Sequence, residues 1–492
     1  MKERYIVGLD QSTQGTKAVL TDSTGQIVEK VFLPHEQIIS PEGWVSHDGE
    51  EIFRNCVHVI RMLIEKAAAN KRDVIAIGIS NQRETTIAWD RKTGRPVEKA
   101  IVWQCARAKG ITAQFEGTPF ERSVRAKTGI PLSPYFPAAK AAWILQNVSA
   151  AKDLAENGRL CIGTIDSWLI YKLTDGKAFK TDYSNASRTQ LFNLHTLQWD
   201  EEICRTLGIP ISALAEVNPS DANFGSTTLA GFFDTPVPIS AALGDSHAAL
   251  FGQGCVQPGM AKATYGTGSS VMMNIGSKFR ESGSGLVTSL AWGQNGHVEY
   301  VLEGNINYSG AVITWLQKDL GLIQNAGESG TLAGAANPAD RTYLVPAFSG
   351  LGAPYWSNDA KAVFCGMSRT TGRRELVKAG VEAIAYQVTD IIEAMGLDSG
   401  LQMTELRVDG GPTENKYLMQ FQSDMAQVKI CVPRQQELSA LGAAYMAGIA
   451  CGLLKRDILS ADRTKETYRP KMKRPERQRK YDGWKAAVKK AL

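Results

Sequence analysis

The chain has 492 residues, of which 43% are hydrophobic and 21% charged, with a formal net charge of +5 at pH 7. This length exceeds one core and predicts two or three domains, while the composition excludes a disordered or fibrous protein. No apolar run reaches membrane-spanning length and no signal-peptide pattern precedes the first strand, so we expect a cytoplasmic protein without a membrane partner.

Strands and helices alternate along the chain. In the first half, the apolar patterns predict strands over 5–10, 17–21, 27–33, 74–79 and 237–243 and helices over 49–69 and 136–147. In the second half, they predict a strand–turn–strand over 261–275, a strand over 406–408 and helices over 309–320, 373–396, 413–427 and 437–452. This order favours an α/β fold of two similar domains, 1–252 and 253–492, with a cleft between them.

Two turns rich in Gly, Ser and Thr stand about 250 residues apart, at 8–17 (GLDQSTQGTK) and 264–270 (TYGTGSS). Such turns present backbone N–H groups and hydroxyls to an anion, and their small residues let a phosphate approach closely. Asp10 and Lys17 in the first turn and Gly266 in the second are therefore candidate contacts of a nucleotide, with Asp10 as a ligand of Mg²⁺. The alternative is two ordinary hairpins.

Asp245 follows the buried strand predicted over 237–243, where a carboxylate is well placed in an α/β cleft. As a general base it would accept a proton from a hydroxyl group that attacks a phosphate. The alternative is that Asp245 caps the helix that follows.

A second set of candidates suits a polyol, which needs hydrogen-bond donors and acceptors at close range. Arg83 and Glu84 follow the strand predicted over 74–79, and Trp103 and Tyr135 offer aromatic walls. The alternatives are a surface ion pair for Arg83 and Glu84 and ordinary core packing for the two rings.

Asp409-Gly410-Gly411 leads from a buried strand into a helix, which indicates a close backbone approach to a ligand such as the sugar or base of a nucleotide. Asn415, one helical turn further, would reach an adenine ring. The alternative is a helix start without a ligand.

The C-terminal segment 463–492 is basic, with 12 Lys and Arg against 3 Asp and Glu. It shows no aromatic platform for bases, and Tyr481, Trp484, Ala487, Val488 and Leu492 recur at helical spacing. We therefore expect an amphipathic helix rather than a nucleic-acid site. The eight cysteines have no metal or disulfide spacing and are expected to be reduced and mostly buried.

Together these segments resemble the FGGY family of carbohydrate kinases, and within it the glycerol kinases most closely. The resemblance runs from about residue 5 to residue 451 and is carried by 9–11 (LDQ), 81–86 (NQRETT), 100–105 (AIVWQC), 135–145, 181–188 (TDYSNASR), 248–253 (AALFGQ), 264–268 (TYGTG), 345–356 (VPAFSGLGAPYW), 407–411 (RVDGG) and 419–424 (MQFQSD).

The resemblance implies an actin-like and hexokinase-like fold, made of duplicated ribonuclease-H-type domains with an interdomain catalytic cleft. It implies Asp245 as the catalytic base, Arg83, Glu84 and Tyr135 on the substrate hydroxyls, and Trp103 on the pocket wall. The residues implied around Mg-ATP are Asp10, Thr13, Gln14, Thr267, Gly310, Gly411 and Asn415, with Thr314 in place of a glutamine of the family. It also implies a small-molecule substrate, no nucleic-acid partner, and a homodimer or homotetramer.

Two departures from the glycerol kinases lie in the substrate pocket. Ser270 stands where they usually carry Phe, and Ser246 where they carry Gln. Exchange of Phe for Ser lengthens the pocket and adds a hydroxyl, and an unpaired buried polar group costs about 1–3 kcal/mol. This favours phosphorylation of a primary hydroxyl on a polyol or ketose of four or five carbons. The alternatives are a glycerol kinase proper and a non-catalytic, sugar-sensing member of the same fold.

Overall fold

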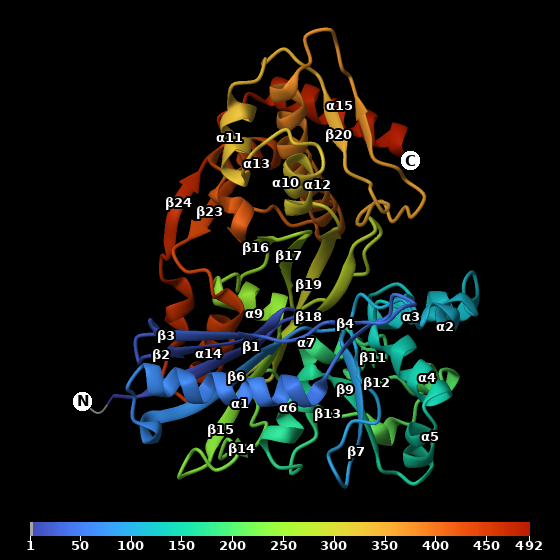
Figure 1. Cartoon of the computed structure of the whole chain (residues 1–492), viewed down its shortest axis with the longest axis vertical. Helices are drawn as coiled ribbons and strands as arrows, with labels where there is room; N and C mark the ends of the chain where they lie inside the picture. The colour runs from blue at the N-terminus through green and yellow to red at the C-terminus, as the bar shows by residue number, and fades with distance from the viewer. Residues whose placement is uncertain (1–2) are drawn as a thin grey trace.

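A computed structural model describes residues 3–492. Its lower part in Figure 1 is built on a six-stranded sheet, and the helices α1 (Gly49–Lys66) and α14 (Leu438–Ala450) pack against its strands. The strand order is β14 (Ser226–Thr227), β15 (Val237–Gly244), β6 (Val74–Asn81), β1 (Tyr5–Gln11), β2 (Gly15–Thr21) and β3 (Ile27–Pro34). The strands β1, β6 and β15 run parallel, whereas β1, β2 and β3 form an antiparallel meander.

The upper part contains a seven-stranded sheet. Its order is β18 (Val287–Gln294), β19 (His297–Ile306), β17 (Ser269–Gly276), β16 (Ala261–Tyr265), β22 (Glu405–Asp409), β23 (Lys429–Pro433) and β24 (Thr464–Tyr468). Here β16, β17 and β19 form the meander, and β22 and β23 continue parallel to β16. The five central strands thus repeat the order of the first sheet, and the predicted duplicated α/β fold is confirmed.

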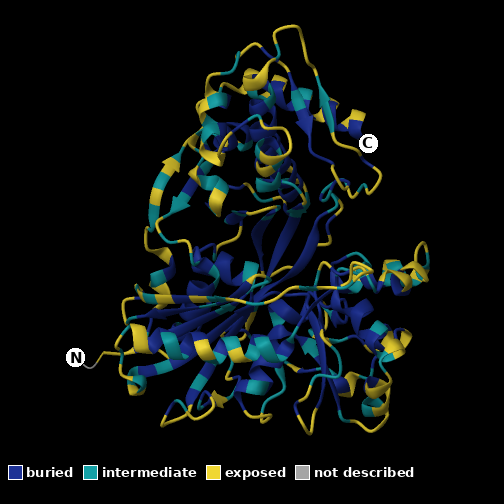
Figure 2. Cartoon of the chain, viewed as in Figure 1, coloured by how far each residue is buried: buried dark blue, intermediate teal, exposed yellow. Residues whose placement is uncertain are grey.

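A further sheet of five strands lies beside the first. It consists of β4 (Ile38–Ile39), β5 (Val45–His47), β8 (Ala100–Ile101), β7 (Thr86–Asp90) and β9 (Leu160–Thr164). The other long helices are α3 (Pro119–Thr128), α4 (Pro137–Asn147), α6 (Ile165–Leu173), α9 (Asp245–Gly252), α10 (Gly310–Lys318), α11 (Ala326–Gly334), α12 (Arg373–Ser399), α13 (Lys416–Ala426) and α15 (Arg474–Ala491). Figure 2 shows that the sheets form the buried interior of both parts.

Most elements predicted from the sequence are present, and two differ. The helix predicted over 413–427 begins at Lys416, because a 3₁₀ turn occupies Gly411–Glu414. The C-terminal segment forms α15 as expected, with Tyr481 and Trp484 buried, but Leu492 is 59% exposed and lies outside the packed face. Among residues 3–492, no helix combines the length and apolarity needed to cross a bilayer.

The helix α14 comes from the last quarter of the chain, yet it lies directly on the first sheet, against β1, β6 and β15, and against α9. Glycines permit this close approach. A Cβ atom at Gly78 of β6 would lie 2.0 Å from the carbonyl oxygen of Ala443, and one at Gly442 would lie 1.8 Å from that of Ala248. Neither oxygen belongs to a side chain that can move aside. The backbone of α14 is therefore in contact with those of β6 and of α9, the helix that begins with Asp245.

Replacing Gly442 with Ala is expected to lower the free energy of unfolding by about 1–3 kcal/mol, because overpacking forces these backbones apart. Gly110→Ala is the matched control, since a Cβ atom there meets nothing within 4 Å and alanine favours the helix. Urea denaturation of both variants measures the difference. An unchanged Gly442→Ala protein would show that the α9–α14 contact yields without cost.

Candidate active site

Strand register brings the two predicted acidic residues to the same edge of the first sheet. Asp10 follows the buried residues of β1 and pairs with Ser80 of β6. Gly244, just before Asp245, pairs with Asn81. Because β1, β6 and β15 are parallel, both carboxylates leave the sheet at its carboxyl edge. Burial and the charge of Asp245 raise the pKa of Asp10 to about 6, against a hydrogen bond from Ser80 Oγ at 2.8 Å.

Asp245 is the first residue of α9, whose N-cap is Gly244, so the alternative role of Asp245 as a helix cap is wrong. One carboxylate oxygen accepts the backbone N–H of Ser246 at 2.6 Å and lies 3.3 Å from Nε of Arg83. The side chain is 35% exposed. Burial raises its pKa and the charge of Arg83 opposes the rise, so Asp245 is an accessible carboxylate with increased affinity for a proton.

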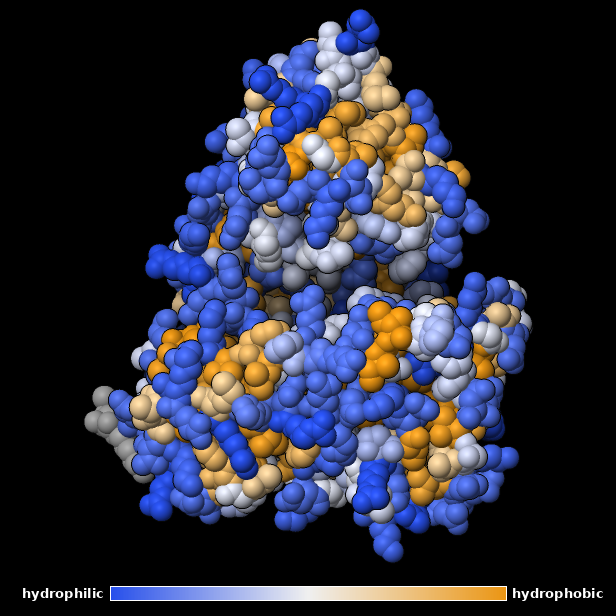
Figure 3. Space-filling view, viewed as in Figure 1, coloured by the Kyte–Doolittle hydropathy of each residue, from blue (hydrophilic) through white to orange (hydrophobic). Residues whose placement is uncertain are grey.

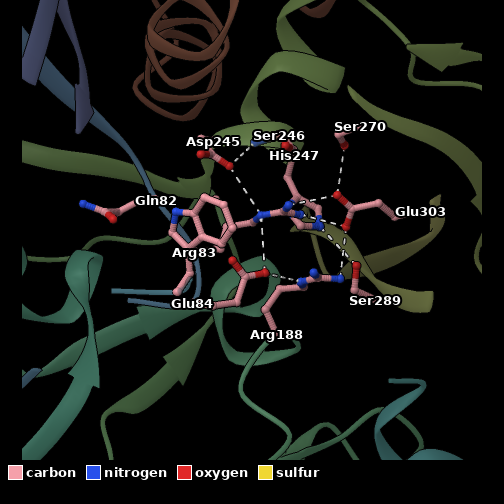
Figure 4. A network of polar contacts seen from close by, with 12 residues as sticks. Gln82, Arg83, Glu84, Arg188, Asp245, Ser246, His247, Ser270, Ser289 and Glu303 are labelled. Carbon is pink, nitrogen blue, oxygen red and sulfur yellow. Dashed lines mark hydrogen bonds and ion pairs between the residues drawn. The ribbon is translucent and has the colours of Figure 1, made fainter. Parts of the chain in front are cut away.

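A buried network of two arginines and two carboxylates lies next to Asp245 (Figure 4). Arg83 donates from both terminal nitrogens to Glu303, at 2.8 and 2.9 Å, and its Nε lies 3.7 Å from Glu84. Arg188 donates from Nε to Glu84 at 2.7 Å and lies 3.0 Å from Glu303. Arg83 and Glu84 are at most 6% exposed, so the surface ion pair considered from the sequence is wrong. The network joins β6 and β19, which belong to different sheets.

Ser270 on β17 faces this network. Its hydroxyl is half-buried and donates to Oε1 of Glu303 at 3.0 Å. Next to it, Nε2 of His247 lies 3.2 Å from the Ser289 hydroxyl, and burial holds the pKa of His247 low enough to keep the ring neutral. Ser246 lies beside Asp245 at the start of α9 and is half-buried. The wall around Asp245 is therefore polar, and the Ser270 hydroxyl already has a partner.

Two aromatic rings form the other wall. Trp103 and Tyr135 lie 5.4 Å apart between ring centroids, and both are half-buried. The indole Nε1 of Trp103 donates to the hydroxyl of Thr13, which links this wall to the first turn. Lys140 donates to the carbonyl oxygens of Glu84, at 3.2 Å, and of Tyr135, so its ammonium holds both segments together.

The second turn and the residues predicted on the nucleotide side meet above the second sheet. Backbone N–H groups of Ser309 and Gly310 donate to the carbonyl oxygens of Thr267 and Gly266, at 2.8 and 2.9 Å. A cavity of about 760 Å³ opens between α10, α11 and α13, and its lining includes the predicted residues Gly310, Thr314, Gly411 and Asn415. Figure 3 shows the molecule hollowed between its lower and upper parts.

Two of the predicted residues already have side-chain partners, and a third is exposed. Asn415 caps α13, accepting the N–H of Leu418 at 3.0 Å, and its amide donates to Ser329. Lys17 forms an ion pair with Glu437 at the start of α14, while Gln14 is exposed on the turn. Sequence reasoning missed Glu303 as a member of the site, although its charge interrupts the uncharged run 300–306 of β19.

Matching sheets, a pair of small-residue turns and a carboxylate in the cleft between them define a two-domain, actin-like phosphotransferase. Models of the FGGY family of carbohydrate kinases match the chain, the N-terminal domain over residues 5–252 and the C-terminal domain over 261–451. The chain belongs to the FGGY family of carbohydrate kinases, enzymes that transfer a phosphoryl group to an alcohol acceptor. The boundary expected between residues 252 and 253 stays a prediction.

Curated relatives that match over the full length include glycerol kinases. The chain is 46% identical to the glycerol kinase of Geobacillus sp. (strain WCH70), covering 100% of this chain and 99% of that one. The structure of Plasmodium falciparum glycerol kinase with ADP aligns with a TM-score of 0.94 and 36% identity, over 100% and 98% of the two chains. A xylulose kinase from Lactobacillus acidophilus shares the fold, with a TM-score of 0.88 and 22% identity over 99% and 98%.

Proposed function

We propose that this kinase transfers the γ-phosphoryl group of ATP to a primary hydroxyl of a small polyol, with glycerol as the first candidate. The observation that carries the proposal is the half-buried but accessible carboxylate of Asp245, 3.3 Å from Arg83 and at the same sheet edge as Asp10. The names of the full-length relatives favour glycerol over the longer acceptors expected from Ser270.

Asp245 acts as the general base. Its raised pKa suits it to accept the proton of the attacking hydroxyl, and the hydrogen bond from the Ser246 N–H holds the carboxylate in place. Glu84 and Tyr135 lie next to Arg83 and orient the substrate diol, while Trp103 covers its carbons. Closure of the two parts around the substrate excludes water from the transfer.

ATP is assigned to the cavity lined by Gly310 and Gly411, whose 760 Å³ lies within the range of nucleotide-sized sites. The two turns supply backbone N–H groups for the phosphates. Asp10 would hold a divalent cation, because burial and the neighbouring charge of Asp245 raise the pKa of Asp10, and a positive charge stabilises such a carboxylate. Mg²⁺ is the cation expected at a site with few protein ligands, because it keeps water and phosphate oxygens in its coordination shell. When bound, it would neutralise charge on the phosphates.

Activity is expected to fall as the pH drops through about 6, because Asp10 then takes up a proton and loses its affinity for a cation. The loss in kcat/KM approaches about tenfold per pH unit below that value, as for a single ionisation. Initial rates at low substrate concentration measure it, with the melting temperature recorded at each pH to separate unfolding. A flat profile from neutral pH to well below 6 contradicts the role of Asp10.

A second candidate function follows from Ser270. Its small, hydroxyl-bearing side chain borders the network where a phenyl ring would otherwise fill space, which favours a four- or five-carbon polyol or ketose. Against this, the hydroxyl is already paired with Glu303, so it does not require an additional substrate hydroxyl.

A coupled assay of ADP release over glycerol, dihydroxyacetone, tetritols, pentitols, ketopentoses and ketohexoses separates the two candidates, with the Asp245→Asn protein as blank. Highest kcat/KM on glycerol supports the first candidate. Higher kcat/KM on one longer acceptor, lost in Ser270→Phe while glycerol turnover is kept, supports the second. No turnover of any acceptor overturns both.

A further inference from the structure

A separate cavity of about 320 Å³ lies away from the catalytic residues, on the side of the second sheet where β22, β23 and β24 meet the end of α9. Its walls also include the start of α14 and the segment 460–464. The lining residues lie between Gly252 and Arg469 of the chain, and the cavity volume falls within the range of small-molecule sites.

Positive charge predominates on the cavity wall. Four cations, Arg407, Lys429, Arg463 and Arg469, line it together with two acids, Glu405 and Asp462. Both oxygens of Glu405 are occupied, one by Arg407 Nε at 2.8 Å and the other by Lys429 Nζ at 2.5 Å. The excess of two positive charges matches a phosphate dianion.

The cations are held in different ways. The guanidinium of Arg463 donates to the carbonyl oxygen of Ile458 at 2.6 Å and stacks 4.8 Å from the ring centroid of Tyr445. The Arg407 guanidinium also donates to the carbonyl oxygen of Gln253, and this bond fixes the guanidinium against the cavity wall. Arg469 is exposed, and within residues 3–492 its guanidinium has neither an ion pair nor a hydrogen bond. A pre-positioned pair of guanidinium groups and one free guanidinium group suit an anion that arrives from solvent.

Two glutamine oxygens on the same wall lack donors. Gln253 is only 6% exposed, and its Nε2 donates to Asp409 Oδ2 at 2.5 Å. A carboxylate only accepts hydrogen bonds, so this bond fixes which amide atom is the nitrogen. The amide oxygen Oε1 then has no hydrogen-bond partner in the described part of the chain. Oε1 of Gln435 is likewise buried without a donor. A buried acceptor without a donor costs about 1–3 kcal/mol, which a ligand hydroxyl would recover.

We propose that this cavity is a second ligand site, which binds a small organic phosphate carrying hydroxyl groups. The phosphate meets Arg407, Arg463 and Arg469, and the hydroxyls donate to Gln253 and Gln435. The site is distinct from the cavity assigned to ATP and requires no turnover.

Isothermal titration calorimetry of the full chain tests the proposal with three phosphate probes: glycerol 3-phosphate, ribose 5-phosphate and glucose 6-phosphate. For at least one probe, Arg469→Gln is expected to weaken binding by about tenfold or more, as loss of a charged hydrogen bond predicts. Lys471→Gln is the matched control, because Lys471 is a nearby cation outside the cavity lining. This variant should bind each probe as the unaltered protein does. Equal affinities in the unaltered and Arg469→Gln proteins for all three probes overturn the site.

A second variant and a simpler probe test the hydroxyl contacts. Gln435→Met keeps the length of the side chain and removes its amide. It should therefore lower the affinity for the sugar or polyol phosphate several-fold and leave the affinity for inorganic phosphate unchanged. Inorganic phosphate should bind less tightly than the organic phosphate. Equal affinity of the two probes, or no effect of Gln435→Met, overturns the assignment to hydroxylated phosphates. The melting temperature of each variant confirms that it is folded.

Discussion

Replacing Asp245 with Asn is expected to lower kcat by about 10²–10⁴-fold, the contribution of a positioned general base. Asn has nearly the same shape and can still accept the Ser246 N–H, but it cannot take the proton of the attacking hydroxyl. Substrate affinity should change little, because the acceptor oxygen is retained. Steady-state rates and a direct titration of the acceptor substrate measure the two quantities separately.

Asp153→Asn is the control for this substitution. It makes the same exchange at an exposed aspartate that has no part in the site, so kcat should stay within a few-fold of the unaltered enzyme. If Asp245→Asn retained full kcat, Asp245 would not be the base and the proposed mechanism would fail.

Arg83→Gln is expected to lower the free energy of unfolding by about 3–5 kcal/mol, as found when one partner of a buried ion pair is removed. Glu303 would lose both of its hydrogen bonds from Arg83, and Glu84 and Asp245 would lose a neighbouring positive charge. Arg188 alone cannot balance three carboxylates in one buried cluster. Denaturant unfolding measures the loss, and Arg95→Gln, the same exchange at an exposed arginine, should change it little.

The Arg83→Gln variant should also show a shifted pH dependence of its residual activity. The charge of Arg83 lowers the pKa of Asp245, so its removal raises that pKa further. Asp245 is then protonated over a wider range, and the acid limb of kcat/KM moves to higher pH. An acid limb that stays in place would show that Arg83 does not act on the base through its charge.

The ends of the parallel strands were predictable from sequence, and the contacts between the sheets were not. An apolar run that stops at Asp10 or Asp245 marks the carboxyl end of a parallel strand. This end lies at the ligand-binding edge of the sheet, whatever the order of the strands. Glu303, in contrast, lies in the middle of β19 and reaches Arg83 only because two separate sheets face each other. The spacing of these residues along the chain therefore does not indicate that their side chains are in contact.

The effect of Ser270 was predicted only in part for the same reason. The sequence shows that a large ring is absent, and the structure places a hydroxyl on the polar network. The partner of that hydroxyl depends on the neighbouring strand β19, whose register with β17 is not encoded in either strand alone. Likewise, α13 begins at Lys416 rather than at residue 413, because a 3₁₀ turn, which has no strong sequence signal, precedes it.

The return of α14 to the first sheet has a consequence for synthesis on the ribosome. The strand β15 completes the parallel set at Gly244, but the helix that covers it begins at Leu438, about 200 residues later. At translation rates of about 5–20 residues per second, the nascent sheet keeps an apolar face open for roughly 10–40 s. During that interval the emerging chain is a substrate for a holding chaperone, and a stall or truncation before Leu438 leaves a fragment prone to aggregate.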